Sequence, residues 1–161
     1  MTKTPAKPDL PAVPSAAEDL LFQTFNEIGI ISQLATARLE RVLPMGLRAS
    51  QFSILNHMVR LGDGRTHQAL TNAFQVTKGA MTNNLTRLLD KGLLTMQVDA
   101  LDGRVKRYYL TSDGRRVREE ARVAIGLGYD ELLAAFEQQE FADALPFLRR
   151  LRSYLDEHRE V

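Results

Sequence analysis

The chain has 161 residues, of which 44% are hydrophobic and 25% charged, values typical of one folded domain with a single core. It contains no cysteine, which excludes disulfide bonds, thiolate metal ligands and thiol-based peroxide sensing. The formal net charge is only +1, so any attraction to nucleic acid must come from local clusters of Lys and Arg. No run approaches the ~20 apolar residues of a membrane span, so we expect a cytoplasmic protein with no membrane partner.

Residues 1–14 contain four regularly spaced prolines and two lysines, a pattern that predicts a disordered, solvated tail. The segment lacks the apolar core of a signal peptide. Ser15 and Glu18 then form a capping-box pattern, which marks the start of a helix. This helix is predicted to run to about Leu43, because apolar residues recur along it in steps of three and four. Its apolar stripe consists of Leu21, Phe25, Ile28, Ala35, Leu39 and Val42.

Three shorter helices are predicted after a break that contains a proline and a glycine. The first covers residues 48–59. The next two, over residues 66–74 and 76–91, are separated by a tight turn. Thr66 is placed to cap one of them, and Gly92 follows the other, as a glycine often does at a helix end. The apolar face of the first consists of Phe52, Leu55, Met58 and Val59.

A β-hairpin is predicted from two extended runs, residues 93–98 and 105–110, which are joined by a polar loop over residues 99–104. A long helix is then predicted over residues 112–136, and a last helix over residues 140–158. The apolar stripe of the last helix consists of Phe141, Leu145, Leu148, Leu151 and Leu155.

Two short helices joined by a tight turn and followed directly by a polar-tipped hairpin form a winged helix-turn-helix arrangement. The predicted fold is therefore mainly α with a small β-hairpin wing, an α+β class. In this arrangement the second helix of the pair, over residues 76–91, lies in a DNA major groove. Its helical wheel places Met81, Leu85, Leu88 and Leu89 inward. The outward face presents Gly79, Ala80, Asn83, Thr86 and Arg87, flanked by Thr77, Lys78 and Thr82.

This outward face suits contact with bases. Gly79 and Ala80 let the helix backbone approach the groove, and Asn83 is predicted to bind an adenine edge, a contact worth roughly 1–3 kcal/mol of discrimination. Lys78 and Arg87 are predicted to reach a phosphate or a guanine. Any surface helix has a polar face, so the hairpin provides the second indication.

Positive charge is concentrated around the hairpin. Asp102 is predicted to pair with Arg104 and to orient its guanidinium toward a narrow, A·T-rich minor groove. The alternative is a solvated basic loop without a partner. The basic residues are Arg104, Lys106 and Arg107 near the loop, with Arg115, Arg116 and Arg118 on the following helix.

From Leu20 to Leu155 the chain resembles the MarR-type family, the multiple-antibiotic-resistance repressors. Residues 76–93 are similar to the recognition helix of that family and to the glycine that leads into its wing. The order and spacing of several short motifs agree jointly with the family. They are Gly46-Leu47 with Gln51-Phe52 at the second helix, Asp102-Gly103-Arg104 at the wing tip, and Leu110-Thr111 with Gly114 at the fifth helix.

The resemblance implies an obligate homodimer, with dimerisation helices over residues 15–45 and 112–161 and a DNA-binding lobe over residues 46–111. Each recognition helix would meet one half of a pseudo-palindromic operator, and the half-sites would lie about 34–36 Å apart or a multiple of this. The implied function is transcription regulation, as a repressor or an activator. The sequence contains no Gly-rich phosphate loop, nucleophile elbow or His–carboxylate pair at helical spacing, so we expect no enzymatic activity and no cofactor. The resemblance also implies a pocket for a small aromatic effector.

Some residues depart from the family pattern. Family members often carry Arg where Asn83 stands, which implies a different base preference. Arg48 replaces the usual Thr cap, and this loses a hydrogen bond typically worth ~1 kcal/mol. Pro146 predicts a kink or a restart in the last helix. Gly126 and Gly128 each weaken the fifth helix by about 1 kcal/mol relative to Ala.

Phe25, Arg38 and His57 are candidate effector contacts, because an aromatic wall and a cation suit an aromatic carboxylate. The simpler interpretation is that they are ordinary core or surface residues, because Phe25 belongs to the apolar stripe of its helix and His57 lies on a helix flank. Two other functions stay open: a winged-helix module that binds protein instead of DNA, and a metal-responsive regulator that uses His57, His67 and His158. These histidines lie on different predicted elements without paired spacing, so we expect no metal.

Overall fold

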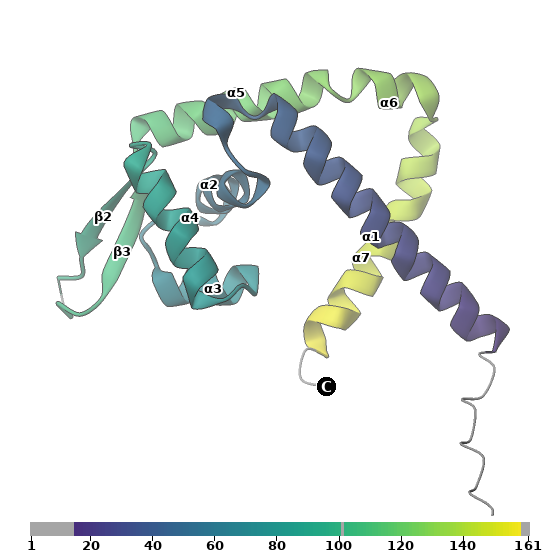
Figure 1. Cartoon of the computed structure of the whole chain (residues 1–161), viewed down its shortest axis with the longest axis horizontal. Coiled ribbons are helices and arrows are strands. Elements are labelled where there is room, and N and C mark those ends of the chain that lie inside the picture. Colours follow the sequence, from purple (N-terminus) through teal and green to yellow (C-terminus); the bar gives the residue numbers. More distant parts are fainter. Residues whose placement is uncertain (1–14, 101, 159–161) are drawn as a thin grey trace, which may run out of the picture. The chain divides into compact units, whose positions relative to one another are not determined.

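The computed structural model describes residues 15–100 and 102–158, so the predicted tail over residues 1–14 lies outside the described residues. The chain divides into two compact units, one ending at Arg38 and the other beginning at Leu39. Within the described ranges, no helix is both long and apolar enough to cross a membrane. The elements in chain order (Figure 1) are α1 (Ala16–Val42), the 3-10 turn η1 (Pro44–Gly46), α2 (Ala49–Leu61), β1 (Arg65–Thr66), α3 (His67–Phe74), α4 (Lys78–Asp90), β2 (Leu94–Val98), β3 (Lys106–Leu110), α5 (Ser112–Leu127), α6 (Asp130–Ala135) and α7 (Gln138–Glu157).

The first unit consists of the greater part of α1. Its start is the predicted capping box, because Ser15 N donates to Glu18 Oε2 at 2.6 Å and Glu18 N donates to Ser15 Oγ at 3.3 Å. The bond from the Ser15 backbone, and then that from its hydroxyl, lowers the pKa of the Glu18 carboxyl. No residue of α1 is buried. The large apolar side chains exposed on the part of α1 up to Arg38 are Leu20, Leu21, Phe22, Phe25, Ile30, Ile31 and Leu34.

The second unit contains one hydrophobic core, formed where α2, α3, α4, α5 and the sheet meet. Leu39 and Phe52 pack against this core while remaining partly exposed. Gln51 is buried among the apolar residues, and its side chain accepts a hydrogen bond from Arg48 N at 3.1 Å. The buried apolar residues are Leu43, Leu47, Ile54, Leu55, Met58, Leu70, Met81, Leu85, Leu88, Leu93, Leu94, Tyr108, Leu110, Val117 and Ala121.

The sheet has three antiparallel strands in the order β1-β3-β2. The predicted hairpin is β2 and β3, in which Met96 pairs with Tyr108. The additional strand β1 is only two residues long and pairs Arg65 with Tyr108 on the other side of β3. The sequence analysis missed it, because two residues give no alternation pattern.

The predicted long helix over residues 112–136 is wrong. It is divided into α5, which ends at Leu127, and α6, which begins at Asp130. The break follows the weak helix formers Gly126 and Gly128, which explains why the chain leaves the helical path here. The last helix, α7, covers Gln138–Glu157 and contains Pro146.

As predicted, the side chain of Arg48 makes no capping hydrogen bond at the start of α2. A side chain from the preceding helix supplies one instead. Glu40, near the end of α1, accepts a hydrogen bond from Ala49 N at 2.9 Å and pairs with Arg48 Nη1 at 2.7 Å. The bond from Ala49, and then that from Arg48, lowers the pKa of the Glu40 carboxyl. The start of α2 is therefore capped by a carboxylate from the preceding helix.

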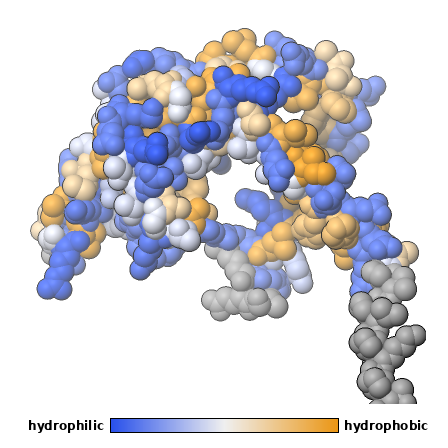
Figure 2. All heavy atoms as spheres, in the orientation of Figure 1, coloured by the Kyte–Doolittle hydropathy of each residue, from blue (hydrophilic) through white to orange (hydrophobic). Residues whose placement is uncertain are grey.

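Large apolar side chains also remain exposed on the C-terminal helices of the second unit. No residue of α6 or α7 is buried, and Figure 2 shows hydrophobic residues along the upper edge, over α5 and α6. These faces have no partner within the described part of the unit. The exposed set is Val123, Leu127, Tyr129, Leu133, Phe136, Phe141, Leu145, Phe147, Leu148, Tyr154 and Leu155.

Candidate nucleic-acid interface

The two faces of α4 differ as the sequence predicted. Met81, Leu85 and Leu88 are buried in the core, and Leu89 is partly buried against it. The opposite face is exposed and consists of Gly79, Ala80, Asn83, Thr86 and Arg87.

The start of α4 differs from the prediction by two residues. The helix begins at Lys78, and Thr77 is its N-cap, whose hydroxyl accepts a hydrogen bond from Ala80 N at 3.2 Å. This cap fixes the first turn of the helix. Thr77 therefore has a structural role besides its place at the edge of the predicted DNA-facing surface.

Two of the predicted DNA contacts on α4 are bonded to each other. Arg87 Nε donates to Asn83 Oδ1 at 3.1 Å. This leaves both N–H groups of the Asn83 amide, and one lone pair of Oδ1, available to a base edge. A pair at i and i+4 also restricts the rotamers of both side chains.

Thr82, at the edge of the exposed face, is bonded to α3. Its hydroxyl lies 2.9 Å from His67 Nε2 and donates to Lys78 O at 2.9 Å. The other ring nitrogen of His67, Nδ1, lies 3.3 Å from the hydroxyl of Thr71. His67 thus connects the two helices of the helix-turn-helix, a role that no sequence pattern indicated.

Two aspartates, Asp99 and Asp102, bond to other residues of the wing. The pairing predicted between Asp102 and the side chain of Arg104 is replaced by a backbone contact. Asp102 accepts a hydrogen bond from the backbone N of Arg104 at 2.9 Å, not from its guanidinium. Asp99 pairs with Arg107 Nε, and Arg107 Nη1 donates to Gly64 O at 3.1 Å. The bond to Asp99 raises the pKa of the Arg107 guanidinium. Arg107 is therefore a structural residue of the wing.

Most of the positive charge predicted around the wing is neutralised. Arg115 pairs with Asp63 at 2.7 Å, Arg116 pairs with Asp113 at 3.0 Å, and Arg118 pairs with Glu119. In the described part of the wing, Arg104 and Lys106 are exposed and make no side-chain ion pair. These two residues carry the charge that remains free for a phosphate.

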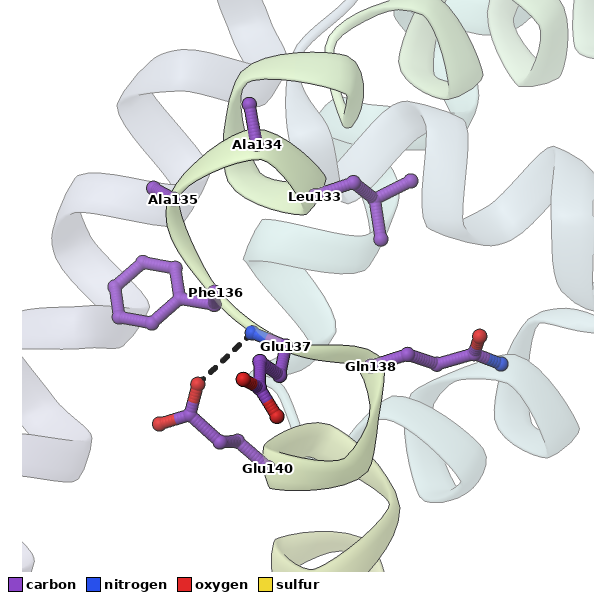
Figure 3. A pocket seen from close by; sticks show the side chains of 7 residues that line it. All are labelled: Leu133, Ala134, Ala135, Phe136, Glu137, Gln138 and Glu140. Atoms are coloured by element: carbon purple, nitrogen blue, oxygen red, sulfur yellow. Dashed lines mark hydrogen bonds between the residues drawn. The ribbon is translucent and has the colours of Figure 1, made fainter.

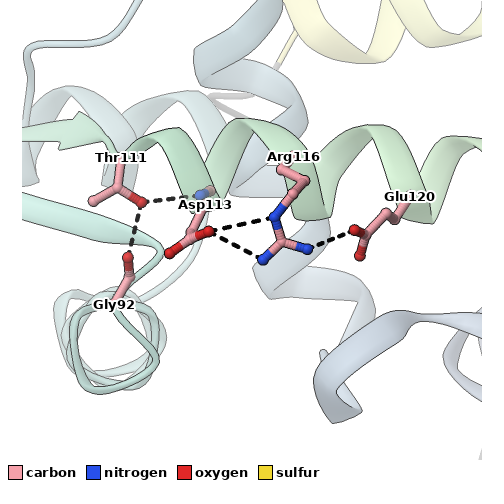
Figure 4. A network of polar contacts seen from close by, with 6 residues as sticks. Gly92, Thr111, Asp113, Arg116 and Glu120 are labelled. Atoms are coloured by element: carbon pink, nitrogen blue, oxygen red, sulfur yellow. Dashed lines mark hydrogen bonds and ion pairs between the residues drawn. The ribbon is translucent and has the colours of Figure 1, made fainter.

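A polar network joins the end of the wing to α5 (Figure 4). The hydroxyl of Thr111, the N-cap of α5, donates to Gly92 O at 2.8 Å and accepts from Gly114 N at 2.9 Å. Thr111 N donates to Leu93 O at 3.2 Å. Thr111 thus fixes the orientation of α5 against the segment that follows α4.

Two of the cavities formed by the described residues lie away from the wing. One, of about 220 Å³, is lined by Ser53, Asn56, His57, Arg60, Leu61 and Phe74. The other, of about 740 Å³, lies where α6 meets α7 and is lined by Leu133, Ala134, Ala135, Phe136, Glu137, Gln138 and Glu140 (Figure 3). Its two charged side chains are carboxylates, and Glu140 Oε2 accepts from Glu137 N at 2.9 Å.

The three candidate effector contacts are divided between the two units. Phe25 and Arg38 lie on α1 in the first unit, whereas His57 lies on α2 in the second. The His57 ring lies 5.2 Å from the Phe74 ring, centroid to centroid. Burial, and then the charges of Arg65 and Arg60, lower the pKa of His57.

The histidines considered for a metal site have separate contacts. His57 packs on Phe74, His67 bonds to Thr82, and His158 stacks on Tyr154 with ring centroids 4.2 Å apart. In residues 15–100 and 102–158, no group of three His, Cys, Asp or Glu side chains is placed to hold a metal ion.

Comparison with known proteins supports the interpretation of this interface. A family model described as "MarR family" matches residues 45–105. Transcriptional regulator HosA of Escherichia coli is 30% identical over 123 residues, which cover 74% of this chain and 89% of HosA.

Two solved structures have the same fold as this chain and are more than 25% identical to it in sequence. The transcriptional regulator BldR from Sulfolobus solfataricus has a TM-score of 0.73 and 27% identity, and the match covers 88% of this chain and 99% of BldR. Wild-type MarR of Escherichia coli, in its apo form, has a TM-score of 0.68 and 26% identity. The match covers 78% of this chain and 94% of MarR.

The chain belongs to the MarR family of winged-helix transcriptional regulators. Members of this family are not enzymes, and membership implies both DNA binding and pairing of two chains.

Proposed function

We propose that this chain is a homodimeric cytoplasmic regulator that binds a pseudo-palindromic operator and responds to a small aromatic ligand. One observation carries the DNA-binding part of the proposal. The exposed face of α4 is small and polar, and its Asn83 amide keeps both N–H groups free. A helix of this kind, backed by a packed face, suits close approach to base edges.

The wing supplies the second contact. Arg104 and Lys106 keep their charges unpaired within the described wing, whereas Arg107 is bonded to Asp99 and Gly64. An arginine free at the tip of a hairpin can insert into a narrow minor groove, where the potential is most negative.

The dimer is proposed from the exposed apolar faces of α1 and of α5–α7. Within each unit these faces leave many large apolar side chains exposed, and exposed apolar faces of this kind commonly mark protein–protein interfaces. Residues 15–45 and 112–161 are therefore the proposed dimerisation region, and residues 46–111 the proposed DNA-binding lobe. Two lobes related by a two-fold axis would meet two half-sites.

The DNA-binding part is tested with the variants Arg104→Ala and Arg122→Ala. Both remove one arginine, but Arg122 lies on α5 and pairs with Glu119 at 2.9 Å. We expect Arg104→Ala to weaken binding to every duplex and to reduce the slope of log affinity against log salt by about 1. Arg122→Ala should bind as the wild type does. If the wild-type protein does not bind duplex DNA even at low salt concentration, the result supports the protein-binding alternative.

The cavity beside His57 is the proposed effector site. Its volume of about 220 Å³ suits a single aromatic ring, His57 and Phe74 supply an aromatic wall, and Arg60 supplies a cation. An effector there would act by favouring one spacing of the two recognition helices over another. Phe25 and Arg38 remain candidate contacts from α1.

Benzoate is a suitable probe of the effector site. We expect it to raise the Tm of the wild type and to change its affinity for DNA, because a ligand that binds the native state stabilises it. Arg60→Gln should abolish both effects. If benzoate changes neither the Tm nor the DNA affinity, aromatic carboxylates are not the effector class.

A further inference from the structure

Gly79 lies in the first turn of α4, on its exposed face. Its φ is not positive, unlike that of Gly92 after the other end of the helix, where φ is 68°. The backbone at Gly79 therefore does not require glycine. A Cβ added to Gly79 would meet no other part of the protein within 4 Å, so packing does not require glycine either.

Glycine is a poor helix former, because it loses more backbone entropy than any other residue when the helix forms. An alanine at this position would suit the isolated protein better. The fold thus gains nothing from Gly79, and the space above its Cα is available to a molecule that approaches α4 from outside.

The surface around Gly79 is apolar. The neighbouring exposed residue, Ala80, carries only a methyl group. Two nearby hydroxyls are already bonded within the protein: Thr77 Oγ1 accepts from Ala80 N at 3.2 Å, and Thr82 Oγ1 donates to Lys78 O at 2.9 Å. Gly79 and Ala80 therefore form a small apolar patch at the start of the exposed face.

The patch lies one helical turn before Asn83, whose amide keeps both N–H groups free for a base edge. Residues at this spacing are about 5–6 Å apart, and successive base pairs are about 3.4 Å apart. In the proposed complex the patch therefore faces a base pair one or two steps from the one that Asn83 reads. The apolar group that a base presents in the major groove is the C5-methyl of thymine.

We propose that Gly79 is a specificity-determining residue, because the space above its Cα admits the C5-methyl of a thymine close to the base pair that Asn83 reads. The inference rests on the proposed function, since it requires α4 in the major groove. Ala80 contacts the same methyl. Cytosine lacks this group, and burial of the methyl against the patch favours thymine at this position.

Replacement of single thymines by uracil tests the contact, because uracil lacks only the methyl and keeps the same base pairing. The probe is the duplex that the full-length wild type selects from a random pool. We expect uracil at one position of each half-site to weaken wild-type binding roughly three- to fourfold for each methyl removed. This position should lie within about two base pairs of the one at which Asn83→Ala relaxes base preference. Uracil outside the half-sites is the control and should have no effect.

Gly79→Ala tests the residue itself. Its new Cβ would occupy the space of the methyl, so we expect it to bind the thymine duplex roughly tenfold more weakly than the wild type does. Uracil at the responding position should restore most of this loss. The variant would then prefer uracil where the wild type prefers thymine.

Thermal melts separate this effect from a loss of folding. Gly79→Ala should raise the Tm by up to about 3 °C, because alanine favours the helix and its Cβ meets no other part of the protein. A variant that is more stable and yet binds DNA more weakly has lost a property of the interface, not of the fold.

Three results would overturn the inference. The first is a Gly79→Ala variant that binds the thymine duplex as tightly as the wild type does. The second is an equal loss of affinity for the thymine and uracil duplexes, which would place the sugar-phosphate backbone, and not a methyl, against Gly79. The third is a wild type that tolerates uracil at every position of the half-sites. Failure of the proposed function is distinguishable, because the wild type would then select no sequence from the pool.

Discussion

Gly114 lies directly against the backbone of Leu93, so closely that an added Cβ would be 2.1 Å from the Leu93 carbonyl oxygen. Gly114 is buried in the first turn of α5, where its N–H donates to Thr111. The Leu-Thr-x-x-Gly pattern thus has a physical cause, since no side chain fits between α5 and the segment that leads into the wing.

Gly114→Ala should therefore destabilise the fold, because the clash is with backbone that cannot rotate away. We expect a loss of about 1–3 kcal/mol of unfolding free energy, as is typical of overpacking, measured by urea denaturation. Gly126→Ala is the matched control in the same helix, since an added Cβ there meets nothing within 4 Å. It should stabilise the protein by up to about 1 kcal/mol. Equal effects of the two variants would contradict the close approach.

Glu40→Gln should lower the Tm at neutral pH, because it weakens the cap of α2 and removes the pairing with Arg48. The folded state lowers the pKa of the Glu40 carboxyl, so its stabilising effect is present above the ordinary glutamate value of 4.5. That effect is lost as the pH falls through the lower, folded value. Thermal melts should show the wild type and the variant converging in acid; a constant Tm difference would contradict this prediction.

His57 should titrate below its ordinary value of 6.5, because burial and the charges of Arg65 and Arg60 lower its pKa. The stability linked to this ring is present above the ordinary value and is lost as the pH falls through the folded value. Proton NMR of the imidazole resonances, assigned with His57→Gln, measures the midpoint. A midpoint at or above the ordinary value would show that the ring is more exposed than the structure indicates.

Asn83→Ala should relax base preference at one position in each half-site by roughly 1–3 kcal/mol, while affinity for random DNA changes little. The variant also frees Arg87 from its bond to Asn83, so it should not weaken phosphate contacts. Asn84→Ala is the control, because Asn84 accepts from Ser50 and is partly buried. A uniform loss of affinity with Asn83→Ala would show that this residue does not read a base.

The sequence predicted those parts of the fold that depend on local patterns. The spacing of Met81, Leu85 and Leu88 identified the buried face of α4, and Ser15 with Glu18 identified the start of α1. Both signals act within a few residues of the chain. The family resemblance, which combined several such patterns, gave the correct fold.

The errors arose where the deciding partner is distant in sequence or the segment is short. Glu40 caps α2 from the preceding helix, and Asp63 neutralises Arg115 across 52 positions. The sequence analysis counted Arg107 in the basic cluster around the hairpin. Its charge is instead paired with Asp99, a contact that forms only in the folded loop. The role of His67 depends on the packing of α3 on α4, which no single-helix pattern contains.

The central claim is that two copies of α4, held together by the terminal helices, read two related half-sites. Selection of bound fragments from random duplex DNA, followed by sequencing, tests it most directly. We predict a two-fold symmetric consensus whose half-site centres lie about 10 base pairs apart or a multiple of this. An asymmetric consensus with a single half-site, or no enrichment at low salt, would contradict the claim.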